Sequence, residues 1–202
     1  NHFEAQGAQD AAVETSGALK TVAVSLSKIA NDIRWLGSGP RAGLGELILP
    51  AVQPGSSIMP GKTNPVICEA MIQGCAQVIG NDMAITIGGQ GGVFELNLML
   101  PLIAHNLTNS ITILSNSTNI FTEKLITGLK ANKEKCAGYI EGSLAMCTSL
   151  APVIGYDKAA QIAYKAFNSG KTVREIAMED NVLDKDKLDE ILDPKSMTMP
   201  SK

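Results

Sequence analysis

Aromatic residues and histidines are scarce in this chain of 202 residues: Phe, Trp and Tyr make up 4% of it, and there are two histidines. Hydrophobic residues still amount to 45%, enough for one large core or for a core with a small satellite domain. A chain that is poor in aromatics, rich in Ala, Ile and Leu, and has its Gly and Pro in clusters favours close-packed helices over a β-sandwich. The composition therefore predicts an all-α fold.

The chain also lacks any block of Lys or Arg. Its formal net charge is −3 and its pI is near 5.4. Proteins that bind nucleic acid or an anionic membrane usually carry a basic patch. We therefore expect neither nucleic acid nor a membrane as a partner, and we expect a small metabolite or another protein instead.

No Asp, Glu, Lys or Arg occurs between Glu95 and Glu123, a length that could span a bilayer. Several Asn, Ser and Thr recur in this stretch, and such groups are costly against lipid. A helix that is uncharged on all sides is typical of burial among other helices of an assembly. The β-branched run 110–113 fits a strand by propensity, but its context favours helix.

Cysteine motifs are absent as well. The four cysteines show no C-x-x-C spacing and no accompanying histidines, so the sequence supports neither a metal site nor a redox motif. Cys68 and Cys75 would lie about 10 Å apart along one helix, too far for a disulfide. We expect reduced, mostly buried thiols and a cytoplasmic location. The start at Asn1, with no initiator Met or signal sequence, indicates an excised segment.

Apolar residues recur at helical spacing over residues 3–36, which predicts one long amphipathic helix. Its many small residues suit close packing against neighbouring helices in a bundle. Residues 37–64 contain four turns rich in Pro or Gly and no sustained period, so they are expected to form a long structured loop. Loops of this length inside compact domains are usually functional.

Two further long helices are predicted. The first runs over residues 65–87 and is interrupted by the Gly-rich cluster 88–92. The second covers about 94–125, with Pro101 either near its first turns or at a kink. After it the elements become shorter and charge returns, which predicts a small helical domain. One helix is expected from Asn132 to about Leu150 and another over 157–167, and two more are expected to begin at the capping box Thr172-x-x-Glu175 and at Asp184.

The most informative stretch is 55–65, with the sequence G-S-S-I-M-P-G-K-T-N-P. Asn64 suits an N-cap and Pro65 suits the first helical position, so a helix is predicted to begin here. Two hydroxyls, an ammonium group and the N–H groups of a helix N-terminus then meet in one short segment. Such a segment is suited to binding a carboxylate.

This stretch resembles the signature G-S-S-x-M-P-x-K-x-N-P of the fumarase/aspartase superfamily, and it matches at every fixed position. The flanks S-G-P-R-A-G-L-G-E at 38–46 and F-E-L-N at 94–97 are most similar to class II fumarate hydratases. Aspartases usually carry Ala where this chain has Gly61. The resemblance implies the C-terminal portion of such an enzyme, with a central helical bundle at 1–125, its signature loop at 38–65, and a small helical domain at 126–202.

The resemblance assigns the catalytic base to Ser56, which acts as an alkoxide and removes a proton from the carbon next to a carboxylate. A Gly-rich loop with free N–H groups could stabilise that alkoxide. Lys62 would bind a substrate carboxylate and stabilise the aci-carboxylate intermediate. Ser57, Thr63 and Asn64 would donate further hydrogen bonds. Thr63 stands where the family usually has Val, so its backbone is the expected contact.

Glu69 is expected to support the site, because the matching Glu in fumarases pairs with a histidine from another subunit that holds the attacking water. That histidine belongs to an upstream segment, and neither His2, at the terminus, nor His105, expected as a hydrogen-bonded core residue, fits its role. Arg41 is expected to brace the loop or the site.

Arg41 has an equally good alternative, a structural ion pair with Glu46 or Asp32. This alternative would give it no part in the chemistry.

The activity implied by the resemblance is that of a hydro-lyase, which adds water reversibly to fumarate to give malate without a metal or an organic cofactor. The implied assembly is a homotetramer with shared active sites, in which amides of the helix at 94–125 bond across subunits. One alternative is an aspartate ammonia-lyase that uses the same Ser56 and Lys62 but releases ammonia. Another is a non-catalytic oligomerisation module, because the upstream part of the site is absent and the isolated chain is expected to be inactive.

Overall fold

A computed structural model of the chain describes residues 1–53 and 58–199. The fold is predominantly helical, which confirms the all-α prediction. The chain divides into two compact units, Asn1–Ala131 and Asn132–Lys202, and each unit has a hydrophobic core of its own.

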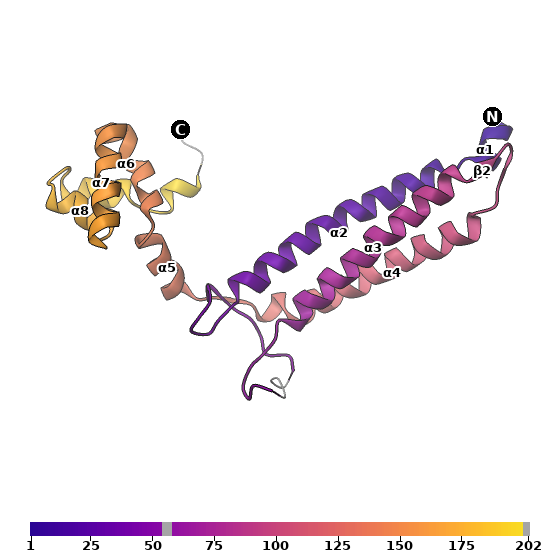
Figure 1. Cartoon of the computed structure of the whole chain (residues 1–202), viewed down its shortest axis with the longest axis horizontal. Helices are drawn as coiled ribbons and strands as arrows, with labels where there is room; N and C mark the ends of the chain where they lie inside the picture. The colour runs from indigo at the N-terminus through magenta and orange to yellow at the C-terminus, as the bar shows by residue number, and fades with distance from the viewer. Residues whose placement is uncertain (54–57, 200–202) are drawn as a thin grey trace. The chain divides into compact units, whose positions relative to one another are not determined.

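Three long helices make up most of the first unit: α2 (Asp10–Leu36), α3 (Val66–Gln90) and α4 (Leu100–Lys124). They lie side by side, and α3 packs against both of the others (Figure 1). The short helix α1 (His2–Gly7) precedes them. The first predicted helix is therefore two helices, because the backbone of Ala8 is extended and breaks the run.

Buried residues follow a seven-residue repeat in this bundle. On α2, Ser16, Ala23 and Ala30 are buried at intervals of seven, and small side chains at these positions let α3 approach closely. The matching buried set on α3 alternates steps of three and four residues, as in a left-handed coiled coil. It consists of Cys68, Met71, Cys75, Val78, Asp82 and Ile85.

A buried polar layer lies about two-thirds of the way along α3. Asp82 faces α2, where it accepts hydrogen bonds from Ser16 Oγ at 2.8 Å and from Lys20 Nζ at 2.5 Å. Asn81, the residue before Asp82, faces α4, and its side-chain amide donates to Ser110 Oγ at 3.1 Å. The layer therefore ties α3 to both neighbours with directional bonds, which apolar packing alone does not supply.

The loop that follows α2 is fastened to the chain that follows α4. Its strand β1 (Leu47–Ile48) pairs antiparallel with β4 (Lys130–Ala131), just after the 3₁₀ turn η1 (Ile126–Gly128). Residues 126–131 consequently pack with the first unit.

At the other end of the bundle, β2 (Gly92–Val93) and β3 (Leu96–Asn97) form a tight hairpin. The prediction that a helix starts at Phe94 is therefore wrong: α4 begins at Leu100, because residues 92–97 turn back on themselves. Pro101 lies in the first turn of α4, as expected.

The Gly-rich cluster does not interrupt α3 where the sequence predicted. Gly88 and Gly89 are helical, and α3 ends only at Gln90. A Cβ at Gly88 would lie 2.7 Å from the side chain of Ile103, so this glycine permits close packing of α3 on α4.

His105 is exposed on α4 in this chain, so the prediction of a core residue is wrong.

None of the helices in residues 1–53 and 58–199 combines the length and apolar character needed to cross a membrane.

The second unit is a cluster of short helices around one core. The capping box is confirmed: Thr172 Oγ1 accepts from the Glu175 N–H at 3.1 Å, and a Glu175 carboxylate oxygen accepts from the Thr172 N–H at 2.7 Å. The helix predicted over 132–150 is divided at Gly142. The elements are α5 (Lys133–Glu141), η2 (Leu144–Met146), α6 (Cys147–Ile154), α7 (Tyr156–Ser169), α8 (Val173–Glu179), α9 (Lys185–Ile191) and η3 (Ser196–Thr198).

Candidate active site

The signature loop connects the end of α2 to the start of α3, so residues 58–65 of its motif lie at one end of the bundle (Figure 1). Ser56 and Ser57 lie outside the described residues. The structure does place the other predicted site residues, Lys62, Thr63, Asn64, Glu69 and Arg41. All of them belong to this loop or to the first turn of α3.

Lys62 follows a tight turn. Its backbone N–H donates to the carbonyl of Met59 at 3.1 Å, and Gly61 between them has a φ of +82°. This left-handed backbone favours glycine over alanine. Lys62 and Thr63 are exposed, so the ammonium group is accessible to a ligand in solution.

The start of α3 differs from the prediction by one residue. Pro65, not Asn64, occupies the N-cap position, and no side chain in the described part of the chain caps this helix. Asn64 instead uses its carbonyl to accept from the Val66 N–H at 2.9 Å. The first-turn N–H groups of α3 are thus left without a capping side chain, and a helix N-terminus in that state attracts anions.

Three polar side chains lie where α2 ends and α3 begins: Arg34, Cys68 and Glu69. Arg34 Nη2 donates to Asn31 Oδ1 at 2.9 Å, while its Nε is buried and has no hydrogen-bond partner among the described residues. Burial raises the pKa of the Cys68 thiol to about 11, the Arg34 charge lowers this pKa, and the half-buried Glu69 raises it. The thiol therefore senses both the positive charge of Arg34 and the negative charge of Glu69.

Arg34 was not singled out from the sequence. Its signal was its position three residues before Gly37, where the predicted helix ends, because this puts it at the same end of the bundle as the loop.

Arg41 is exposed in the loop segment that follows α2. The segment is held by Ser38, whose hydroxyl donates to the Trp35 carbonyl at 2.6 Å and accepts from the Leu44 N–H at 3.0 Å. The predicted alternative of an Arg41–Asp32 ion pair is wrong, because Asp32 pairs with Lys28 one turn earlier on α2.

We predict that Cys68 reacts slowly with iodoacetamide in the folded protein. No disulfide joins the four cysteines, all of which are described, and Cys68 is fully buried while Cys136 is partly exposed. Raising the pKa of Cys68 from 9.0 to about 11 lowers its thiolate fraction near pH 8 by about 100-fold. That fraction then rises about tenfold per pH unit until pH approaches 11.

Mass spectrometry of labelled peptides at pH 8 and pH 10 measures these rates, with Cys136 as the internal reference. In denaturant the two thiols should react alike. Equal labelling of Cys68 and Cys136 in the native protein would contradict the prediction.

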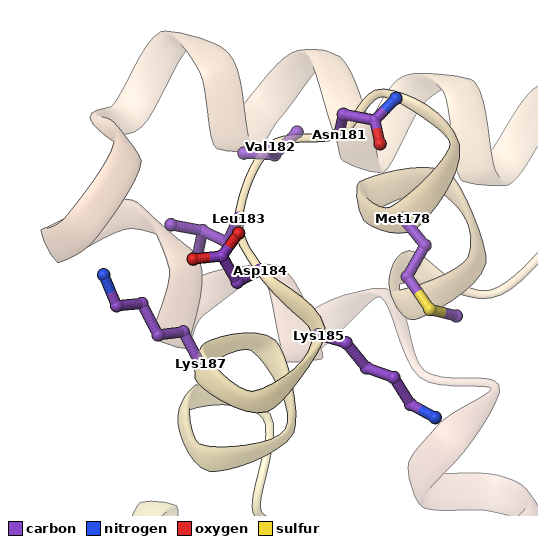
Figure 2. Close-up of a pocket in the computed structure, with 7 residues that line it drawn as sticks. All are labelled: Met178, Asn181, Val182, Leu183, Asp184, Lys185 and Lys187. Carbon is purple, nitrogen blue, oxygen red and sulfur yellow. The ribbon is translucent and has the colours of Figure 1, made fainter.

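A separate hollow of about 550 Å³ lies in the second unit, between α8 and α9. Figure 2 shows that Lys185 and Lys187 extend away from each other, so their charges do not converge on one ligand. No residue predicted to belong to the site lines this hollow.

Two family models match the chain: one described as Lyase over residues 1–80, and one described as Fumarase C C-terminus over residues 146–199. The chain is 51% identical to mitochondrial fumarate hydratase 1 of Arabidopsis thaliana over all of its own length. It is 55% identical to fumarate hydratase class II of Thermosynechococcus vestitus over 89% of its length. The chain belongs to the class II fumarate hydratase family. It matches the C-terminal part of these proteins.

A solved member of this family, the recombinant class II fumarase of Schistosoma mansoni, superposes with a TM-score of 0.92 at 42% identity over the whole chain. The chain spans 41% and 38% of the length of the Arabidopsis and Thermosynechococcus relatives, and 42% of the Schistosoma structure. More than half of each of these three proteins therefore lies outside the aligned region.

Proposed function

We propose that the full-length protein containing this chain is a hydro-lyase that adds water reversibly to fumarate to give malate. One observation carries the proposal: a complete signature motif at a helix start, in a chain whose relatives over its whole length are fumarate hydratases. The substrate would be a small dicarboxylate, and the residues would need no metal or organic cofactor.

In the dehydration direction, Ser56 removes the proton from the carbon next to a carboxylate, and a doubly charged aci-carboxylate develops. Preorganised positive groups are usually the largest contribution to stabilising such a charge. Lys62 is well suited to this role because its ammonium group is exposed beside the uncapped start of α3. Ser57, the Thr63 backbone and Asn64 supply further hydrogen bonds.

Glu69 and Arg41 have supporting roles in this proposal. Glu69 is half-buried at the start of α3, which suits a carboxylate that holds a group from another subunit. Arg41 is exposed in the same loop, where its charge adds to the positive potential that a dicarboxylate meets on approach.

The test is an assay of the full-length protein with fumarate in water, run beside fumarate with added ammonium. Malate in both reactions supports the hydratase. Aspartate formed with ammonium would assign the chain to a sister lyase. That outcome would leave Ser56 as the proposed base, but it would contradict the use of Gly61 to favour a fumarase over an aspartase. Gly61 has a left-handed backbone, which suits the glycine found in fumarases.

We further propose that the full-length protein is a homotetramer with active sites shared between subunits. Support comes from apolar side chains left exposed along the long helices, among them Val24, Ile29, Ile79, Met83 and Ile111. Amides and hydroxyls of α4, such as Asn106 and Asn119, suit hydrogen bonds across subunits at the centre.

Analytical ultracentrifugation of the full-length protein is expected to give four times the subunit mass. The 1–202 chain alone is expected to bind substrate weakly and turn nothing over, because the upstream part of the site is missing. A monodisperse monomer of the full-length protein would contradict the assembly.

We also propose a cytoplasmic location. Support comes from Cys68, Cys75 and Cys147, three buried thiols whose pKa values are raised by burial, as expected for cysteines that pack as small apolar side chains in a reducing compartment.

A further inference from the structure

The signature loop leaves the bundle through residues 46–50, which we call the anchor segment. The Glu46 N–H donates to the Leu36 carbonyl at 2.9 Å, and the next two residues form β1, which pairs with β4. Leu47 and Leu49 pack against the core shared by α2, α3 and α4. A hydrogen bond, a strand pair and two apolar side chains thus fix the anchor segment to the end of the bundle.

The other end of the motif is fixed on the same core. Cys68, in the first turn of α3, is buried in this core, and the neighbouring Ile67 packs against it. Residues 51–64 therefore run between two supports that share one core. The position of the anchor segment sets the point from which the chain enters the motif.

The last residue of the anchor segment, Pro50, lies against Gly128 at the end of η1. A Cβ at Gly128 would be 3.1 Å from Pro50 Cβ and 3.2 Å from Pro50 Cγ. Carbon atoms in favourable contact are about 3.5–4.0 Å apart. The proline ring is bonded to the backbone at two atoms, so it cannot rotate away as a flexible side chain would. A side chain at position 128 must therefore push the backbones of the anchor segment and η1 apart.

In the described structure, nothing else at position 128 requires a glycine. Gly128 is exposed, η1 contributes no buried residue, and its backbone is not in the left-handed region that favours glycine. The three atoms closest to an added Cβ all belong to Pro50. Leu125, just before η1, is buried in the core, so η1 is held and the displacement falls on the anchor segment.

We infer that Gly128 is a positioning residue for the proposed reaction: its missing side chain lets Pro50 lie against η1, and this contact sets the direction in which the signature loop leaves the bundle. The inference rests on the proposed function, in which Ser56 and Lys62 act on the substrate. These two residues are 6 and 12 positions beyond Pro50 in the chain. Gly128 has no chemical group to offer the substrate, and it acts through Pro50.

The first test is the substitution Gly128→Val in the full-length protein. Displacing a reacting group by about 1 Å can lower a rate by about 10²-fold, so kcat for malate formation is expected to fall by about 10–100-fold. The melting temperature should stay close to that of the wild type, because no buried contact is lost at this position. Gly128→Ala should give a smaller loss of kcat, and it carries the test if the valine variant folds poorly.

The matched control is Gly138→Val. Gly138 is an exposed glycine of α5, and a Cβ there would meet no described atom within 4 Å. The same substitution, ten positions further along the chain, should therefore leave kcat unchanged.

A second-site variant separates positioning from a general loss of structure. Pro50→Gly removes the ring that the new side chain would meet, so Gly128→Val with Pro50→Gly should have a kcat several-fold above that of Gly128→Val alone. In the wild-type background, Pro50→Gly should instead lower kcat, because it frees the anchor segment. Opposite effects of one substitution in two backgrounds indicate direct coupling between the two positions.

Hydrogen exchange followed by mass spectrometry gives a readout that is independent of activity. Amides of residues 46–53 should exchange faster in Gly128→Val, and they should keep the wild-type rate in Gly138→Val. Since these residues include β1 and the anchor segment, faster exchange reports directly that the start of the loop has been displaced.

Three outcomes would overturn the inference: a wild-type kcat in Gly128→Val, a loss of kcat that Pro50→Gly does not reverse, or a lowered melting temperature with an unchanged kcat per folded molecule. Failure of the proposed function is detected separately, in the wild type. If the wild type forms aspartate, the comparison is made on that reaction, which uses the same base. If it has no lyase activity, unchanged exchange at residues 46–53 in Gly128→Val would still show that Gly128 does not position the loop.

Discussion

Replacing Ser56 by Ala in the full-length protein is expected to lower the rate of malate formation by about 10²–10⁴-fold. The substituted side chain retains no group that can accept the carbon-bound proton, whereas the positive groups that bind the carboxylates remain. The loss should therefore fall mainly on kcat and leave KM within a few-fold of the wild type, since an interaction used only in the transition state is removed.

A matched control is Ser169→Ala. Ser169 is in the second unit, where its hydroxyl donates to the Lys165 carbonyl at 2.7 Å at the end of α7, so its loss should leave kcat unchanged. Steady-state kinetics with fumarate, and again with malate, measure both directions. If Ser56→Ala retained full activity, another residue would have to be the base, and the proposed mechanism would be wrong even for an active fumarate hydratase.

Replacing Leu150 by Ala is expected to destabilise the second unit by about 2–5 kcal/mol. Leu150 is 0% exposed and lies in a core built from residues of η2, α6, α7, α8 and α9. Removing its branched end leaves a cavity that short helices anchored at both ends cannot easily fill. A small domain has only a modest net stability, so this one substitution should be enough to raise its unfolded population strongly.

Hydrogen exchange followed by mass spectrometry on the full-length protein resolves the two units. Amides of residues 132–202 should exchange much faster in Leu150→Ala, while those of α2, α3 and α4 keep their protection. Val153→Ala on the same helix is the control, because Val153 is 54% exposed and its truncation should change little. Uniform loss of protection across both units would show that they unfold together.

The bundle could be predicted from the sequence because its signal is repeated. Buried positions recur every seven residues through α2 and α3, so single misplaced residues do not obscure the period. The predictions of secondary structure were wrong where a single tertiary contact determines the local backbone. Phe94 was expected to begin a helix, but it lies in the hairpin turn between the paired residues Val93 and Leu96. Gly88 reads as a helix breaker, and only the proximity of Ile103 explains a glycine inside α3.

Some residues of the candidate site could likewise be placed from the sequence, and others could not. Lys62, Thr63 and Asn64 are contiguous in the motif, so their placement together needed no tertiary information. Arg34 is separated from Glu69 by the whole signature loop, and its position beside Cys68 depends on how α2 meets α3. The cap at Pro65 was misplaced because propensities cannot resolve helix ends to one residue.

The polar layer at Asp82 has a consequence for the distant end of α3. Two helices with a seven-residue repeat could slip past each other by one repeat, about 10 Å, and still bury apolar surface. Such a slip would strip Asp82 of Ser16 and Lys20 and leave a buried carboxylate without partners, an outcome that costs several kcal/mol. It would also carry Cys68, at the start of α3, one repeat away from the Arg34 charge that acts on its thiol. The polar layer thus fixes the register of α3 on α2, and with it which residues of the two helices lie together near the signature loop.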